Sequence, residues 1–251
     1  MGRFVLRLTD IRKSFGGAQA LRGARFDVRA GEIHGLVGEN GAGKSTLVNI
    51  ATGVLRADSG TVQFDGNAVV LANPRHAGSL GISVVHQEAD LFPQLSIAEN
   101  MLLSQGMVRR KGGLIDWPAS YRAAERMVAR MGESFDVRAP ASGLSVARRT
   151  MAEIAAALSR NARVLFLDEP TASLSGKEIE SLFARLRELR AAGVAIVFVS
   201  HRLDEILALC DRVTVMRDGE TVATHATSDL SVEKIVAAMI GRARNAVAAR
   251  A

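Results

Sequence analysis

Short apolar runs recur along the chain, and each is bounded by glycine, proline or polar residues. Some are rich in large and β-branched apolar residues, which is typical of strands buried on both faces of a sheet. These predicted strands are residues 33–37, 82–86, 164–167 and 194–199. Residues 3–8 and 24–29 alternate between apolar and polar, so they predict half-buried strands. A strand at 60–64 with a tight turn at 65–67, and a hairpin over 213–223, complete the set.

Apolar residues at helical spacing fill much of the sequence between these strands. Capping boxes beginning at Ser96 and Ser175 mark two helix starts, and Asn73-Pro74 opens a shorter helix. Further helices are predicted over residues 47–52, 118–131, 203–210 and 231–240, and over a segment with Met151, Ile154, Ala155 and Leu158 on one face. The segment from about 89 to 158 lacks a convincing strand, so we expect a helical subdomain inserted between strands of the sheet.

The predicted strand 33–37 leads directly into a glycine-rich segment that fits the P-loop pattern. Its residues are Gly38, Glu39, Asn40, Gly41, Ala42, Gly43, Lys44, Ser45 and Thr46. Glycines let backbone N–H groups turn towards an anion, and the following helix N-terminus adds unpaired donors and partial positive charge. Lys44 is expected to reach the β- and γ-phosphates of a nucleotide, and the Ser45 hydroxyl to ligate Mg²⁺.

Polar residues stand at the ends of three other apolar strands, where ligands bind in open α/β sheets. Asp168 follows one strand and is predicted to hold Mg²⁺, and the adjacent Glu169 to orient or deprotonate an attacking water. Gln87 is predicted to bridge Mg²⁺ and this water, and His201 to donate to the γ-phosphate. The reaction that fits is hydrolysis of ATP by in-line attack of water, with most of the catalysis from positioning and charge neutralisation.

Phe15 lies in the segment 13–17, which is interpreted as a turn between the two half-buried strands. From the local sequence a place in the core is the better interpretation, although stacking on a flat ligand is the alternative. Cys210 is the single cysteine, so no internal disulfide forms, and a small buried apolar role is preferred for it.

The composition restricts the possible partners. With 251 residues, 48% of them hydrophobic, the chain can bury a substantial core. The longest clear apolar run, 194–199, is too short to cross a bilayer, and residues 1–10 form no apolar block, so we expect a soluble chain without a signal peptide. The net charge is +6, but basic residues are dispersed and aromatics are only 4%, so no nucleic-acid partner is expected.

Taken together, these motifs resemble the ATP-binding subunit of an ABC transporter over nearly all of residues 3–241. Gln87 matches the Q-loop, His201 the switch histidine and 164–169 the Walker B strand with its glutamate. The signature segment is matched by Leu144, Ser145, Val146, Ala147 and Arg148. The resemblance implies an α/β fold: a P-loop NTPase core sheet with an antiparallel β subdomain and an inserted α-helical subdomain.

The resemblance also implies the layout of the site and its partners. Phe15 matches the aromatic that stacks on adenine, which reverses the local preference for the core. A second ABC domain would complete a head-to-tail dimer, each ATP lying between one P-loop and the signature segment of the other. The expected single domain covers 1–241: a nucleotide-binding core of 1–88 and 159–241, and a helical subdomain of 89–158. Residues 242–251 are expected to be a frayed tail.

The particular residues in several motifs narrow the resemblance to monosaccharide importers of the ribose, galactose and xylose type. The closest segments are 32–40, 85–88, 91–93 and 96–100. In that group two ABC domains are usually fused, so we expect a stand-alone half, a truncated gene or an excised part. Such a subunit would sit on the cytoplasmic face of the bacterial inner membrane, against transmembrane permease subunits. A periplasmic solute-binding protein would deliver the solute to these permease subunits.

Two departures from the family pattern keep alternatives open. Ala147 and Arg148 replace the usual Gly and Gln of the signature, and Ser175 stands where the D-loop commonly has Asp. The first change adds a methyl group where backbone approaches a phosphate, so it bears on the partner's ATP rather than the one held by Lys44. The departures indicate either variation within the subgroup or an asymmetric pair with one weakened site, and they leave open a regulatory module with feeble turnover. Two further alternatives are an importer of nucleosides or another small solute, whose ATPases share these motifs, and a non-transport ABC protein.

Overall fold

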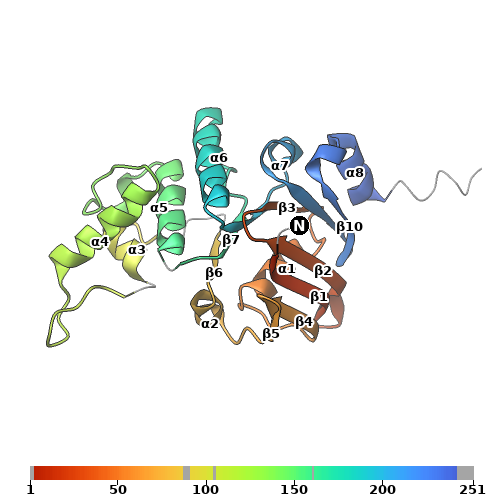
Figure 1. Cartoon of the computed structure of the whole chain (residues 1–251), viewed down its shortest axis with the longest axis horizontal. Helices are drawn as coiled ribbons and strands as arrows, with labels where there is room; N and C mark the ends of the chain where they lie inside the picture. Colours follow the sequence, from red (N-terminus) through yellow and green to blue (C-terminus); the bar gives the residue numbers. More distant parts are fainter. Residues whose placement is uncertain (1–2, 87–90, 104–105, 160, 242–251) are drawn as a thin grey trace, which may run out of the picture.

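The computed structural model describes residues 3–86, 91–103, 106–159 and 161–241. Two β-sheets lie side by side, and a group of helices extends away from them at one end of the molecule (Figure 1). Within the described residues, no helix is both long enough and apolar enough to span a bilayer.

The larger sheet has the strand order β10-β9-β3-β8-β7-β6. Its strands are β3 (Ile33–Gly38), β6 (Ile82–Val85), β7 (Val164–Asp168), β8 (Ala195–Val199), β9 (Arg212–Arg217) and β10 (Glu220–Ala226). All neighbouring pairs are parallel except β9 and β10, which form the predicted hairpin. The four predicted buried strands are therefore confirmed, each with one end shifted by one residue.

Continuous apolar runs arise because both faces of this sheet are covered. In β7, Leu165 and Leu167 contact one core, whereas Val164 and Phe166 contact the other. The first core lies under α6 (Gly176–Ala191), α7 (Leu203–Leu209) and α8 (Val232–Ile240). The second is shared with α1 (Lys44–Ala51) and the smaller sheet.

The smaller sheet is antiparallel, in the order β2-β1-β4-β5. Its strands are β1 (Phe4–Phe15), β2 (Ala18–Arg29), β4 (Ser59–Phe64) and β5 (Asn67–Val69). The predicted strands 3–8 and 24–29 were too short, and the turn predicted over 13–17 is confirmed only at Gly16 and Gly17. Lys13 to Phe15 belong to β1, because Gly16 and Gly17 both have positive φ and close a two-residue hairpin loop whose twist suits the strands.

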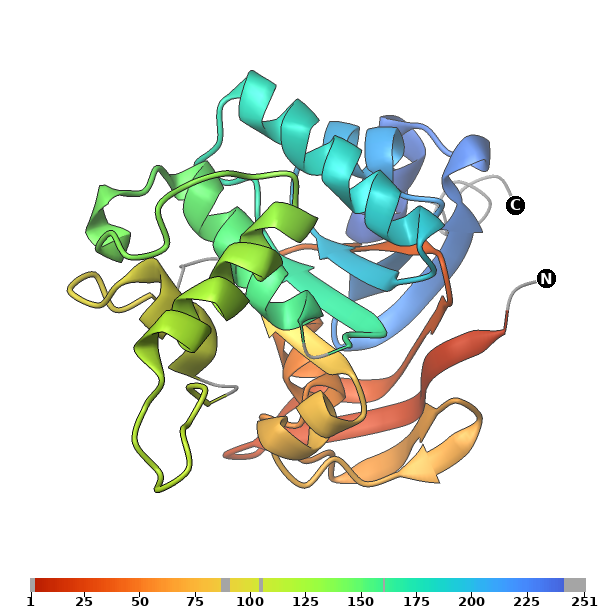
Figure 2. The ribbon, with the colours of Figure 1, turned by 60° about the vertical axis from the view of Figure 1, so that its left-hand side comes forward.

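The helical part contains α3 (Ile97–Leu103), α4 (Trp117–Arg130) and α5 (Val146–Leu158), and it is joined to the core where α5 contacts β6 and α6 (Figure 2). The capping box at Ser96 is confirmed, since the Glu99 carboxylate accepts from Ser96 N while Glu99 N donates to Ser96 Oγ. Asn73 caps α2 (Pro74–Ser79) as predicted. The subdomain boundary near 89 and the tail 242–251 fall outside the described residues.

Candidate nucleotide-binding site

The P-loop is the connection between β3 and α1, as predicted. Strand β3 ends at Gly38, and α1 begins at Lys44 rather than at residue 47, so the lysine and Ser45 already belong to the first helical turn. Gly41 and Gly43 have φ of 83° and 97°, values that side chains disfavour. The loop thus turns sharply and places the helix N-terminus at the carboxyl edge of the sheet.

Two glycines of the loop are also required by the packing of the protein itself. A Cβ on Gly43 would lie 2.7 Å from Leu21 Cδ2 and 2.8 Å from the Ala20 carbonyl oxygen, both on β2. A Cβ on Gly38 would lie 2.5 Å from the Met216 carbonyl oxygen. At Gly41, by contrast, it would meet no described atom within 4 Å. Close packing of the loop therefore explains two of its three glycines.

Lys44 folds back over the P-loop. Its Nζ donates to the carbonyl oxygens of Gly38 at 2.8 Å and Glu39 at 3.1 Å. Burial lowers the pKa of the ammonium group, and the nearby Glu169 and Asp168 carboxylates partly oppose this effect. The cation is thus held at the loop, on the side that faces the two acids.

The strand ends meet at one edge because the sheet is parallel there. In the register of the sheet, Asp168 of β7 and Leu36 of β3 both pair with Val199 of β8. Only β8 therefore separates Asp168 from the strand that leads into the P-loop. Burial and the neighbouring Glu169 raise the pKa of Asp168, while His86 and Lys44 act in the opposite direction. His86 was not predicted as a site residue. Its position directly after β6, at the same edge of the sheet, is the feature from which it could have been predicted.

Glu169 and His201 are brought together across β7 and β8. His201 Nδ1 lies 3.2 Å from Glu169 Oε1, with Glu169 24% and His201 64% exposed. Glu169 N donates to the Val199 carbonyl oxygen, and its φ of 48° is in the left-handed region. Such a conformation in a non-glycine residue costs about 1–3 kcal/mol and needs support from the surrounding structure.

Phe15 is at the tip of the β1–β2 hairpin and is 47% exposed. The local interpretation as a core residue is therefore wrong, because a hairpin loop projects its flanking side chains into solvent. Lys13 Nζ lies 5.6 Å from the centre of the Phe15 ring. The contact with adenine that the resemblance implies stays a prediction, and Gln87 lies outside the described residues.

The signature segment is not close to the P-loop of its own chain. Ser145 caps the N-terminus of α5 and accepts from Arg148 N at 3.4 Å, and Val146 and Arg148 are exposed. In Figure 1, α5 lies in the helical part of the molecule, apart from α1. The predicted site residues therefore fall into two separate groups.

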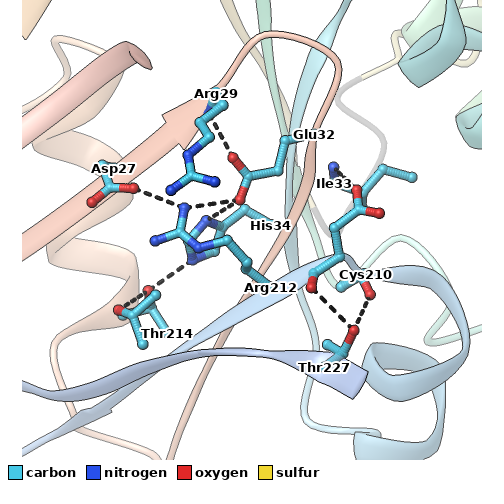
Figure 3. Close-up of polar contacts among 11 residues, drawn as sticks. Asp27, Arg29, Glu32, Ile33, His34, Cys210, Arg212, Thr214 and Thr227 are labelled. Atoms are coloured by element: carbon cyan, nitrogen blue, oxygen red, sulfur yellow. Dashed lines mark hydrogen bonds and ion pairs between the residues drawn. The ribbon is translucent and has the colours of Figure 1, made fainter. Parts of the chain in front are cut away.

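A buried polar cluster supports the strand that delivers the P-loop (Figure 3). Glu32 Oε1 accepts from His34 Nδ1 and from Arg212 Nη1, both at 3.0 Å. His34 Nε2 lies 2.7 Å from Thr214 Oγ1 on β9. Burial alone would raise the pKa of Glu32, but the His34 hydrogen bond and the Arg212 charge outweigh it and hold that pKa below its usual value.

Comparisons with known proteins agree with this geometry. The family described as ABC transporter matches residues 21–172. A Burkholderia lata protein, provisionally named as a ribose/galactose/methyl galactoside import ATP-binding protein, is 49% identical over 238 residues. Ribose import ATP-binding protein RbsA 2 of Burkholderia ambifaria is 47% identical. Each alignment covers 95% of this chain but 46% and 47% of the relative, so the chain spans about half the length of the curated relatives it matches.

Solved structures include the ADP conformation of MJ1267, an ATP-binding cassette of an ABC transporter. It matches with a TM-score of 0.80 at 28% identity, over 94% of this chain and 95% of that chain. The family match takes in the P-loop, Asp168 and Glu169, and it spans more than half of the described chain. This chain therefore belongs to the ABC transporter family, in which it is an ATP-binding domain.

Proposed function

We propose that this chain binds ATP with Mg²⁺ at the P-loop edge and hydrolyses it to power the import of a monosaccharide. The observation that carries the proposal is the convergence of Lys44, Asp168, Glu169 and His201 at one edge of the sheet. Lys44 would reach the β- and γ-phosphates. Phe15 is exposed and would stack on adenine, and Gln87 would contact Mg²⁺ and the attacking water.

The residues at this edge suit Mg²⁺, which prefers hydroxyl, carboxylate and phosphate oxygens. Ser45 is exposed at the start of α1, and Asp168 stands at the end of β7, so the two would hold the ion together with Gln87. Burial and the neighbouring Glu169 carboxylate raise the pKa of Asp168, and a divalent cation bound there would favour its ionised form. When bound, Mg²⁺ would neutralise charge on the phosphates.

Hydrolysis requires a base for the attacking water and donors for the γ-phosphate. Glu169 is half-buried and would take the proton of the water as its oxygen attacks phosphorus. His201, in contact with this carboxylate, would donate to a γ-phosphate oxygen. The P-loop amides and Lys44 would stabilise the charge that leaves with ADP.

The separation of the signature segment from the P-loop supports a composite site. We propose that Ser145 to Arg148 face the ATP of a second ABC domain in a head-to-tail pair. Like the P-loop, this segment leads into a helix N-terminus, whose backbone N–H groups and partial positive charge suit a phosphate. The Ala147 methyl would hinder close approach there, and Arg148 would partly compensate with its charge.

A groove between the core and the helical part supports a transmembrane partner. It has a volume of about 300 Å³, and its lining includes Pro74, His86, Phe92, Met101, Leu103 and Ala156. Phe92 and Leu103 are exposed large apolar residues, which often mark protein contacts. We propose that permease subunits dock here, which would place the chain peripherally on the cytoplasmic face of the membrane. The monosaccharide assignment comes from the names of the relatives.

The proposal is tested by Glu169→Gln with ATP and Mg²⁺. Removing a general base typically costs 10²–10⁴-fold in rate, so we expect kcat to fall by about that factor while ATP still binds and the closed dimer is favoured. Phosphate release and fluorescent-nucleotide binding measure the two effects. Lys44→Ala serves as the comparison and should weaken nucleotide binding itself. Unchanged hydrolysis in Glu169→Gln would remove Glu169 from the base role.

A further inference from the structure

Glu205 is an acid in α7 that the sequence pattern did not single out, since its helix is amphipathic and acids there are typically solvated. In the structure it is only 3% exposed. A buried carboxylate is costly unless it is hydrogen-bonded or paired, so its partners indicate what it does. Those partners come from two loops, one following β7 and the other following β8.

The first partner is on the loop that carries Glu169. Thr171 is 1% exposed, and its Oγ1 donates to Glu205 Oε2 at 2.6 Å. The loop turns tightly here, as Ala172 N donates to the Glu169 carbonyl oxygen and Leu174 N to that of Thr171. Thr171 therefore attaches the loop at Glu169 to α7, in addition to the bond from Glu169 N to Val199 of β8.

The remaining partners are on the loop that carries His201. Ser200 Oγ donates to the same oxygen, Glu205 Oε2, at 3.2 Å and itself accepts from Arg202 N at 3.0 Å. Arg202 Nη1 lies 2.8 Å from Glu205 Oε1. This second contact is an ion pair without hydrogen-bond geometry, since Oε1 accepts no hydrogen bond among the described residues. Both neighbours of His201 are thus held by one carboxylate.

We infer that Glu205 is a positioning residue for hydrolysis, whose carboxylate joins the Glu169 loop to the His201 loop. The inference rests on the proposed function and assigns a role beyond the residues that contact ATP. His201 is 64% exposed, so its own burial does not fix its place; Ser200 and Arg202 do. A displacement of about 1 Å in a catalytic group can cost about 100-fold in rate. Losing the connection between the two loops should therefore affect turnover more than ATP binding.

Thr171→Val and Thr171→Ser form the main test in the full chain. Valine has nearly the shape of threonine but lacks the hydroxyl that donates to Glu205, whereas serine keeps it. We expect Thr171→Val to lower kcat at least tenfold with the KM for ATP within twofold, and Thr171→Ser to restore most of the rate. Thr171→Val with wild-type kcat, or no rescue by serine, would overturn the inference.

Ser120→Ala is the control for loss of a buried hydroxyl. Ser120 is completely buried in α4, and its Oγ accepts from Val108 N at 3.1 Å, away from the P-loop and from both loops. We expect Ser120→Ala to lower the melting temperature while leaving kcat near the wild-type value. Equal losses of kcat in Ser120→Ala and Thr171→Val at similar melting temperatures would reduce Glu205 to a merely structural role and contradict the inference.

Glu205→Gln distinguishes the contacts of Glu205 with the Glu169 loop from those with the His201 loop. The measurement is amide hydrogen exchange in the absence of nucleotide. The remaining carbonyl oxygen of the substituted side chain can still accept from Thr171 and Ser200, but the ion pair with Arg202 is lost. We expect faster exchange at 200–202 and little change at 169–174, with the opposite pattern in Thr171→Val. Uniform acceleration over both loops in both variants would contradict the assignment. Wild-type chain that does not hydrolyse ATP would instead refute the proposed function, without bearing on this exchange pattern.

Discussion

Gly41 and Gly43 are two residues apart in the P-loop and have similar positive φ, yet their surroundings differ. The Cα of Gly43 faces Leu21 and the Ala20 carbonyl of β2, whereas that of Gly41 faces open space. At the scale of single residues, one glycine thus serves conformation alone and the other serves conformation and packing. The P-loop pattern treats both positions alike, because a pattern records residue types and not neighbours.

Substitution by alanine should separate these two contributions. Gly41→Ala should lower the free energy of unfolding by about 1–2 kcal/mol, because only the left-handed backbone becomes strained. Gly43→Ala should add about 1–3 kcal/mol to this loss, because the new methyl group overpacks against β2. Urea unfolding of the two variants measures the difference in the free energy of unfolding. Equal destabilisation would show that the loop moves away from β2 without penalty.

At the scale of elements, β3 is the strand that positions the phosphate site, and side-chain hydrogen bonds anchor its beginning. Glu32 stands directly before β3 and bonds to His34 within it and to Arg212 of β9. Arg212 Nη1 also donates to Asp27 of β2 at 2.9 Å, so the cluster joins both sheets (Figure 3). The same strand therefore holds the P-loop at one end and connects the sheets at the other.

This cluster predicts an acid-dependent share of stability. The pKa of Glu32 is lowered in the folded state, so its contribution is complete above the ordinary glutamate pKa of about 4.3. It is lost as the pH falls below that value towards the lowered pKa, because the folded state must then take up a proton. Glu32→Gln should cost about 2 kcal/mol at pH 7.

Urea unfolding at several pH values checks this sign. Below about pH 4.3 the free energy of unfolding should fall more steeply with acidification in the wild type than in Glu32→Gln. Between pH 6 and 8 the two slopes should be the same, since Glu32 is ionised in both states there. If the free energy of unfolding had the same slope against pH in both proteins throughout, His34 and Arg212 would not lower the pKa of Glu32.

At the scale of the whole molecule, the two groups of site residues lie on different parts of the fold. The P-loop and the strand ends share an edge of the core, while Ser145 lies at the start of α5 in the helical part. In the proposed head-to-tail pair, each of the two places would supply one half of an ATP site. Head-to-tail pairing is the arrangement that would use both.

Ser145→Ala and Ser96→Ala test this pairing as a matched set. Both remove a helix cap in the helical part, and each should cost about 1 kcal/mol of stability. Only Ser145→Ala should reduce hydrolysis, by roughly 100-fold if it removes a donor to the transferred phosphate, without weakening ATP binding to isolated chains. Equal turnover in the two variants would contradict a role for the signature segment in the partner's site.

The amino-acid sequence by itself determined the strands of the larger sheet, the P-loop and the acids at the strand ends. Period-two and period-3.6 patterns, caps and glycine spacing are local, so these features can be recognised without the fold. Parallel strands then bring their ends together, which is why Lys44, Asp168 and Glu169 could be grouped in advance. The antiparallel sheet was predicted with strands too short, because its pairing continues beyond the alternating residues.

Tertiary structure alone decided the remaining features. Phe15 is exposed because β1 continues up to the Gly16–Gly17 loop, and the length of β1 is set by its pairing with β2. Glu205 is buried between the loop that leads into α7 and the loop that follows β7, which is distant in sequence. The left-handed backbone of Glu169 depends on its bond to Val199. The contacts of Glu205 with Thr171 and of Glu169 with Val199 join residues far apart in the chain, and no local pattern records such contacts.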